Sequence, residues 1–275
     1  MLKWKKQKEP IMRLCVLGSG SKGNCTFIEG DKTRILIDCG LNKTEIERRL
    51  SLIGIDPSSI QAILITHEHS DHIAGLNSFA KKYGCKVFAH PATWNAMEQK
   101  VRNIPLGNCV SITTSNFEVN ELGVEAFSLS HDSAHCLGYS VINEAKKVSM
   151  ATDLGYIDDA IISQLADSSL VVLETNHDIE RLRLNPRYPL YLKQRILSNN
   201  GHLNNKDSAT AVLKMLGYGI RGLVCAHLSE ENNTPELVLS TLNQVVAAQG
   251  GDLAKEINVD IAHQDRVGNL YRIKS

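Results

Sequence analysis

The 275-residue sequence lacks several features that would assign a protein to a class at once. It contains no run of 18 apolar residues, which excludes a predicted membrane-spanning helix. Its 30 basic and 30 acidic residues cancel, so no overall field draws the chain to nucleic acid or to an anionic membrane. Aromatic residues make up only 5% of the chain, and we expect no aromatic platform for stacking bases.

The cysteines lack a recognisable spacing. Seven cysteines without a C-x-x-C pair argue against a disulfide framework and against a structural zinc site. The initial "MLKWKKQKEP" is basic and is not followed by the apolar stretch of a secretory signal. We therefore expect reduced thiols and a cytoplasmic location. We expect residues 1–11 to form a basic extension open to disorder, with Met12 as an alternative start, and residues 12–275 to form one domain.

The sequence does contain short apolar runs that stop at an ionisable residue. Runs rich in Val, Ile and Leu are typical of buried strands, and stretches with helical spacing, such as Ile46, Leu50 and Ile53, lie between them. This alternation predicts an α/β fold with helices covering the sheets and a ligand site beyond the strand ends. The runs lead to Asp38, His67, His131, Asp153, Glu174 and His227.

The stretch "VLGSGSKGN" contains the G-x-G-x-x-G pattern of a dinucleotide-binding turn. Such a turn must open a helix, because the pyrophosphate binds at the helix N-terminus. Here "NCTFIEGDKTRILID" follows, which predicts two strands joined by a turn at Gly30 and Asp31. We therefore interpret the stretch as a turn between strands whose Ser19, Ser21 and Asn24 could meet a substrate phosphate.

The stretch "ILITHEHSDHIAG" brings four potential metal ligands together after a buried strand. His67 and His69 are two residues apart, so in extended backbone they face the same side and can reach one ion. Asp71 and His72 lie where the chain turns into the next helix and can point to a neighbouring ion. Clustered imidazole and carboxylate groups are typical of zinc, manganese or iron sites. Further ligands must come from elsewhere, and His131, Asp153 and His227 are candidates.

The segment "THEHSDHIAG" resembles the H-x-H-x-D-H motif of the metallo-β-lactamase superfamily, and the resemblance extends over nearly the whole chain from Met12. It implies a single domain with an αββα sandwich of two mixed sheets flanked by helices. It also implies two divalent metal ions bridged by Asp153, with Asp38 orienting ligands from behind. The implied ligands are His67, His69 and His131 for the first ion, and Asp71, His72 and His227 for the second.

Within the superfamily, "MRLCVLGSGSKGNCTFIE", "LSHDSAHCLGY", "LETNHD" and "AHLSEENNTPE" resemble the WalJ/YycJ group of bacterial proteins. Members are regarded as exonuclease-like metallohydrolases that act on DNA. The resemblance implies a phosphodiester hydrolase in which a metal-bridging hydroxide attacks and both ions stabilise the phosphate. Asp71 would help to orient the nucleophile.

An additional His, His202 in "NNGHLNN", is similar to the extra His of the tRNA-processing enzyme tRNase Z, in which a Glu matching Glu174 supports it. We hypothesise that His202 is the general acid for the leaving alkoxide and that Glu174 fixes its tautomer. The alternative is a loop histidine that caps a helix.

The substrate stays open at this stage. A hydrolase of small or cyclic phosphodiesters fits the neutral net charge, and a thioester hydrolase of the glyoxalase II type is chemically feasible. DNA is favoured over RNA, and nothing indicates a membrane partner or an oligomeric state. A basic segment before His202 is either a solvated loop or a phosphate-binding surface, and it comprises Arg181, Arg183, Arg187, Lys193, Arg195 and Lys206.

Overall fold

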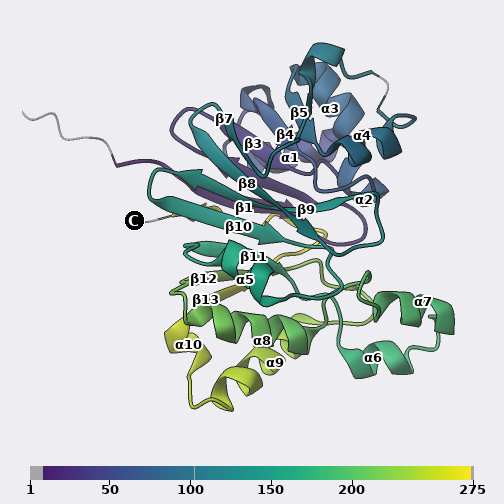
Figure 1. Cartoon of the computed structure of the whole chain (residues 1–275), viewed down its shortest axis with the longest axis vertical. Coiled ribbons are helices and arrows are strands. Elements are labelled where there is room, and N and C mark those ends of the chain that lie inside the picture. Colours follow the sequence, from purple (N-terminus) through teal and green to yellow (C-terminus); the bar gives the residue numbers. More distant parts are fainter. Residues whose placement is uncertain (1–8, 102, 274–275) are drawn as a thin grey trace, which may run out of the picture.

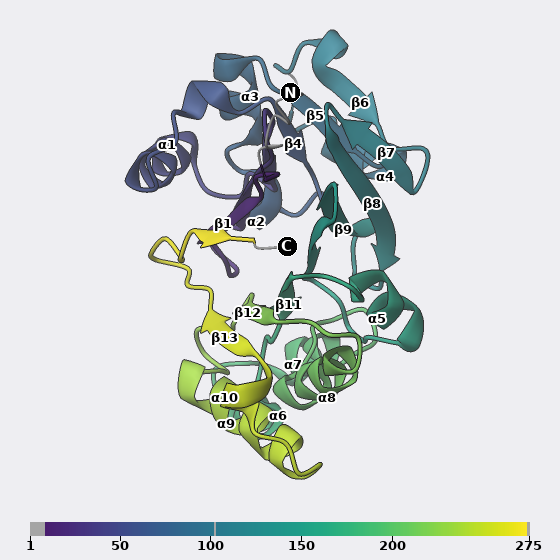
Figure 2. The same ribbon diagram turned by 90° about the vertical axis from the view of Figure 1, so that its left-hand side faces the viewer.

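The computed structural model describes residues 9–101 and 103–273 of the chain. Within these residues two seven-stranded β-sheets face each other, and helices cover the outer face of each sheet, as Figure 1 and Figure 2 show. This αββα sandwich confirms the predicted fold class.

The first sheet comes from the N-terminal part of the chain and from its last strand. Its strands lie in the order β14, β1, β2, β3, β4, β5, β6. Pairing is antiparallel from β14 to β3 and parallel from β3 to β6. The bounds are β1 Arg13–Gly18, β2 Cys25–Glu29, β3 Arg34–Ile37, β4 Ala62–Leu64, β5 Lys86–Ala89, β6 Cys109–Ser111 and β14 Tyr271–Arg272.

The second sheet has the order β13, β12, β11, β10, β9, β8, β7. Its strands are parallel from β13 to β10 and antiparallel from β10 to β7. The bounds are β7 Asn116–Val119, β8 Leu122–Leu129, β9 Cys136–Asn143, β10 Lys146–Ala151, β11 Leu170–Glu174, β12 Gly222–Ala226 and β13 Asn258–Ile261.

The helices form two outer layers and one group at an edge (Figure 1). The first sheet is covered by α1 Lys43–Leu52, α3 Leu76–Tyr83 and α4 Pro91–Met97. The second sheet is covered by α5 Asp159–Leu165, α8 Asn205–Leu216, α9 Pro235–Ala247 and α10 Leu253–Glu256. The edge group is α2 Ser70–Ile73, α6 Ile179–Leu184 and α7 Leu190–Ile196, and short 3-10 helices span η1 Pro57–Ser59 and η2 Leu106–Asn108.

Each strand contributes to two cores because successive side chains point to opposite faces. Leu14 and Val16 of β1 enter the core between the sheets, whereas Cys15 and Leu17 pack in the core beneath α1 and α3. A third core lies between the second sheet and its helices. Because both faces of the central strands are buried, strands such as β3, β4 and β11 are nearly continuous apolar runs, which is why these runs predicted them.

The glycine-rich turn connects β1 directly to β2, which pair antiparallel, so the predicted turn between strands is confirmed. No helix follows it before β3 ends at Ile37. Gly23 has a φ of 149°, and a Cβ there would overlap the backbone of Gly40. The tight turn thus requires glycine for packing rather than for a cofactor.

The predicted N-terminal extension falls largely on residues 1–8, which lie outside the described residues. Of its last part, the Pro10 carbonyl accepts a hydrogen bond from Lys146 Nζ at 2.7 Å, and the Ile11 amide donates to Asp31 Oδ1 at 3.0 Å. Among the helices of residues 9–101 and 103–273, none combines the length and apolar character needed to cross a membrane.

Candidate active site

The residues predicted from the strand ends meet in one cluster of His, Asp and Glu side chains. Asp38 follows β3 and His67 follows β4 in the first sheet, while the second sheet supplies the other four. Three of these strand-end residues have left-handed backbone conformations, with φ of 62° at Asp38, 63° at Asp153 and 56° at His227. The second-sheet residues are His131 after β8, Asp153 after β10, Glu174 at the end of β11 and His227 after β12.

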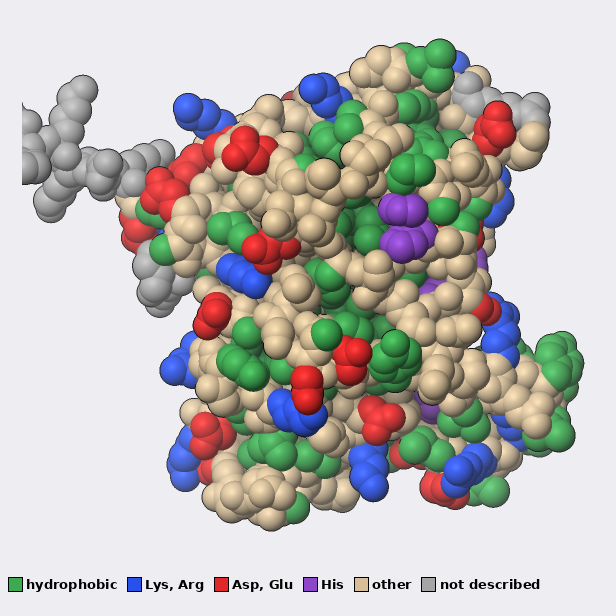
Figure 3. Space-filling model, in the orientation of Figure 1, with side chains coloured by type: hydrophobic (Ala, Val, Ile, Leu, Met, Phe, Trp, Pro, Cys, Tyr) green, Lys and Arg blue, Asp and Glu red, His purple; other side chains and the backbone are tan. Residues whose placement is uncertain are grey.

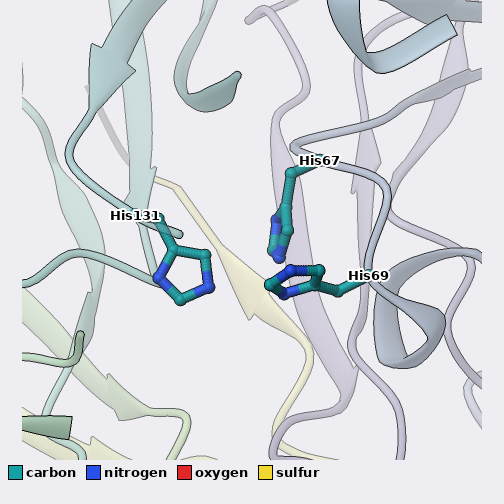
Figure 4. Close-up of side chains that lie close together, drawn as sticks. All are labelled: His67, His69 and His131. Atoms are coloured by element: carbon teal, nitrogen blue, oxygen red, sulfur yellow. The ribbon is translucent and has the colours of Figure 1, made fainter. Parts of the chain in front are cut away.

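His67, His69 and His131 converge from the two sheets, as Figure 4 shows. The ring centroids of His67 and His69 are 4.5 Å apart, and His131 lies 5.0 Å from His67 and 5.1 Å from His69. One ring nitrogen from each falls within 4.8 Å of the others, which is close enough to share one ion.

A second group forms beside the first. Ligand atoms of Asp71, His72 and His227 also lie within 4.8 Å of one another. Asp153 lies between the groups, with Oδ2 at 3.2 Å from His72 Nε2 and Oδ1 at 3.8 Å from His131 Nε2. The structure thus brings together both ligand sets that the sequence resemblance implies, with Asp153 between them.

Several buried polar atoms of these groups have no hydrogen-bond partner. They are Nε2 of His67, Nε2 of His227 and Oδ2 of Asp153. Nearly all buried polar atoms in proteins are paired, so three orphans around one gap fit a site for cations. Imidazole and carboxylate donors suit zinc, manganese and iron alike.

A network behind the histidines fixes their orientation. Asp38 is fully buried, and its Oδ2 lies 2.7 Å from His72 Nδ1. Thr66 Oγ1 lies 3.0 Å from both Asp38 Oδ2 and His67 Nδ1. Both Nδ1 atoms are therefore occupied, so each ring can offer Nε2 to an ion. The role of Thr66 was not predicted from the sequence, although a hydroxyl residue directly before the first His was a usable signal.

The charges of the site balance one another. Burial raises the pKa of Asp153, but the charges of His227 and His72 outweigh it and hold the carboxylate ionised. Burial lowers the pKa of His67, which keeps that ring neutral and able to bind a metal. Burial also lowers the pKa of His227, but Asp153, Asp71 and Glu174 outweigh it and raise the value to about 10. A bound cation would replace this proton, so ion binding is coupled to proton release.

His202 and Glu174 form a pair next to these groups. His202 Nδ1 lies 2.8 Å from Glu174 Oε1, and its ring centroid lies 5.1 Å from that of His131 and 5.2 Å from that of His227. Glu174 is fully buried and also accepts the amide of Leu154 at 3.0 Å. Burial raises the pKa of Glu174, but the charges and hydrogen bonds of His202 and His227 outweigh it and lower the value to about 2.

The three polar residues of the glycine-rich turn lie in different surroundings. Ser19 Oγ is buried and accepts the His227 amide at 2.8 Å. Asn24 is buried, and its Nδ2 lies 3.1 Å from His72 Nε2. Ser21 is exposed and lines the adjoining pocket. Two of the three therefore contact the ligand groups directly, and a role for any of them in substrate binding stays a prediction.

A pocket of about 180 Å³ opens beside the His/Asp groups. Its lining includes His202 and His227 together with Tyr188 and Arg195. Arg195 pairs with Asp132, whose Oδ1 lies 3.3 Å from His131 Nε2. The sequence analysis did not single out Asp132 or Tyr188, because neither belongs to a strand-end pattern.

Comparisons with known proteins agree with this geometry. The model of the β-lactamase superfamily domain matches residues 33–227. Exodeoxyribonuclease YycJ of Bacillus anthracis is 36% identical over 240 residues, which is 87% of this chain and 90% of the relative. Exodeoxyribonuclease WalJ of Streptococcus pneumoniae is 38% identical over 243 residues, which is 86% of this chain and 89% of the relative.

Among solved structures, the metallo-β-lactamase fold protein YhfI from Bacillus subtilis superposes with a TM-score of 0.70 at 16% identity. The match covers 95% of this chain and 99% of that one, and at this identity it shows the fold alone. The chain is therefore a hydrolase of the metallo-β-lactamase superfamily, and it belongs to the family that contains YycJ and WalJ.

Proposed function

We propose that this hydrolase cleaves phosphodiester bonds in DNA and removes nucleotides from a strand end. Relatives that share 36–38% identity over about nine tenths of their length are named exodeoxyribonucleases, which supports the substrate class. The observation that carries the proposal is the His202–Glu174 pair beside the His/Asp groups.

The donor set fits two divalent ions. His67, His69 and His131 would hold one ion, Asp71, His72 and His227 would hold the other, and Asp153 would contact both. Such ions supply an activated water and neutralise charge on the phosphate oxygens. Asp71 is the carboxylate with access to solvent, since 20% of its side chain is exposed, and it would orient the attacking water.

The leaving group of a phosphodiester is an alkoxide, which needs a proton as the bond breaks. Glu174 accepts the Nδ1 proton of His202, so the second ring nitrogen can carry the proton that is transferred. Burial lowers the pKa of His202, but the charge of Glu174 and its hydrogen bond outweigh it and keep the ring protonated at higher pH. A thioester leaves as a thiolate, which needs no such donor, so the pair favours phosphodiesters over a glyoxalase II type of substrate.

The substrate class is tested by offering the protein, loaded with manganese and separately with zinc, a series of labelled compounds. These are linear single-stranded DNA, linear duplex DNA, circular DNA, RNA, a cyclic phosphodiester and a glutathione thioester. We expect release of nucleotides from linear DNA and none from circular DNA. Activity on the cyclic compound alone would overturn the proposal in favour of a small-molecule phosphodiesterase. The Asp153→Asn variant, purified identically, measures any contaminating nuclease.

A further inference from the structure

A helical arm projects from the sandwich (Figure 1), and some of its residues line the active-site pocket. We define the α6–α7 arm as residues 179–196, which comprise α6, α7 and their connection. None of the residues of α7 is buried, and the arm exposes 78% of Leu184, 70% of Leu190 and 73% of Tyr191. Single exposed hydrophobic residues also occur elsewhere on the surface, as at Leu106, but three of them gather in this short arm, and gathered apolar side chains mark interaction sites.

The same arm is strongly basic in a chain of zero net charge. It carries five basic residues against one acidic residue, Glu180. In the space-filling view of Figure 3, hydrophobic and basic side chains lie side by side at the lower right, where Figure 1 places α6 and α7. The basic residues are Arg181, Arg183, Arg187, Lys193 and Arg195.

One face of the arm is a wall of the active-site pocket. Tyr188, Leu192, Arg195 and Ile196 line the same pocket as His202. Within α7, residues 192, 195 and 196 share one helical face. Tyr191 precedes Arg195 by one turn of α7, so the two side chains are neighbours on the helix surface, and Tyr191 is 73% exposed. The arm therefore places an exposed aromatic ring beside a cation that lines the same pocket as His202.

We propose that the α6–α7 arm holds a single-stranded end of the DNA substrate, an inference that rests on the proposed function. Exposed aromatic rings combined with cations are the recognition mode of single strands, because unpaired bases offer a face for stacking while the phosphates meet the charges. Bases inside a duplex are already stacked and cannot use Tyr191. Tyr188 and Tyr191 would supply the stacking faces, whereas the low aromatic content of the sequence predicts no such platform.

The cations of the arm are held in place by weak surface contacts. Arg187 pairs with Glu231 and Arg195 pairs with Asp132. Lys193 Nζ donates to the backbone carbonyl of Arg183 at 2.6 Å. Exposed pairs of this kind contribute little to stability, so a phosphate can replace the partner at small cost. The side chains are therefore positioned for a strand before it arrives.

The test measures binding by fluorescence anisotropy with the manganese-loaded protein. The probes are a labelled 15-nucleotide single strand and the blunt duplex of the same sequence, both with phosphorothioate linkages that block hydrolysis. We expect Tyr191→Ala to weaken single-strand binding by roughly fivefold to 150-fold, the range for loss of one stacked base. Tyr191→Phe keeps the ring and should bind like the wild type. Duplex affinity should change less than twofold in both variants.

The charges are tested by the salt dependence of the same binding. Removal of Arg187 and Lys193 together by alanine should reduce the slope of log affinity against log salt by about 1.4, because each phosphate contact on a single strand contributes about 0.7. Lys255→Ala on α10 is the matched control, since this lysine is also exposed and paired, at 2.9 Å from Asp252. It should leave the slope unchanged.

The outcomes separate the two proposals. If the wild type cleaves linear DNA but Tyr191→Ala binds the single strand as the wild type does, the arm has no such role and the proposed function stands. The same conclusion follows if Tyr191→Ala instead converts a dimer to a monomer in light scattering, which would make the arm an interface between two copies. If the wild type neither binds nor cleaves DNA of any form, the proposed function itself fails.

Discussion

Replacement of His202 by alanine should slow DNA cleavage far more than it disturbs the fold. The side chain is 21% exposed, and Glu174 keeps its hydrogen bonds from His227 at 2.9 Å, Leu154 at 3.0 Å and Leu203 at 3.1 Å. The structural cost is therefore one charge-assisted hydrogen bond, on the order of 1.5–3 kcal/mol. Loss of a general acid costs a factor of roughly 10²–10⁴ in rate, or about 3–5 kcal/mol of transition-state stabilisation.

The leaving group separates this role from simple damage to the site. In bis(p-nitrophenyl) phosphate the leaving nitrophenolate is a stable anion and needs no proton. We expect turnover of DNA by His202→Ala to fall by roughly 10²–10⁴-fold and turnover of the nitrophenyl ester by less than about tenfold. Both are measured as kcat with the metal-saturated enzyme. His135→Ala is the matched control. This partly exposed histidine lies outside the ligand groups, and its ring stacks on that of His90 with 3.8 Å between the ring centroids. Equal losses on both substrates would refute the role of His202 as a proton donor.

Three further predictions concern metal binding, stability and the ligand loop. Asp38→Asn removes the negative charge that orients His72, whose Nδ1 lies 2.7 Å from Asp38 Oδ2. Metal affinity, measured by calorimetry, should therefore fall by about 10–100-fold. An unchanged affinity would contradict the supporting role of Asp38. Burial lowers the pKa of His177 to about 4, so the unfolded chain takes up a proton at this residue before the folded chain does as the pH falls. The free energy of unfolding therefore keeps its full value above pH 6.5 and decreases as the pH falls toward 4. Between pH 7 and 4.5, His177→Phe should lose about 2 kcal/mol less unfolding free energy in urea than the wild type, and parallel pH curves would contradict this. A Cβ at Gly40 would overlap the carbonyl oxygen of Asp71. Gly40→Ala should therefore shift the segment that carries Asp71 and reduce DNA turnover by roughly 100-fold. Normal turnover and an unchanged melting temperature would contradict this prediction.

The sequence predicted which residues lie at the strand ends where one local rule applied. In a sheet buried on both faces, a strand is a continuous apolar run, so its end is visible in the sequence as the first ionisable residue. This rule identified Asp38, Asp153 and His227, which lie far apart in the chain and meet at one edge of the sandwich. It also explains why the glycine-rich turn could be separated from a dinucleotide site, since the strand after Asn24 was readable in the same way.

Other features depend on tertiary contacts that no local pattern encodes. Thr66 follows β4, and its hydroxyl is oriented by Asp38, which follows the neighbouring strand β3; Thr66 Oγ1 lies 3.0 Å from Asp38 Oδ2. The α6–α7 arm reads as a basic loop in the sequence, and the exposure of Tyr191 follows from how α7 projects from the sandwich. Which basic residues line the pocket could not be deduced, because helical spacing within α7 does not say which face meets His202.

The left-handed turns at Asp38, Asp153 and His227 set evolutionary limits on this fold. A residue other than glycine held at positive φ costs of order 1 kcal/mol or more, so three such positions use a sizeable share of the roughly 5–15 kcal/mol that stabilises a domain. Aspartate and histidine adopt this backbone more readily than most side chains, but only glycine adopts it without strain, so selection for stability alone would favour glycine at these positions. These three side chains are therefore retained although they lower the stability of the fold. A lineage that no longer needed the chemistry should lose them first while it keeps the sandwich intact.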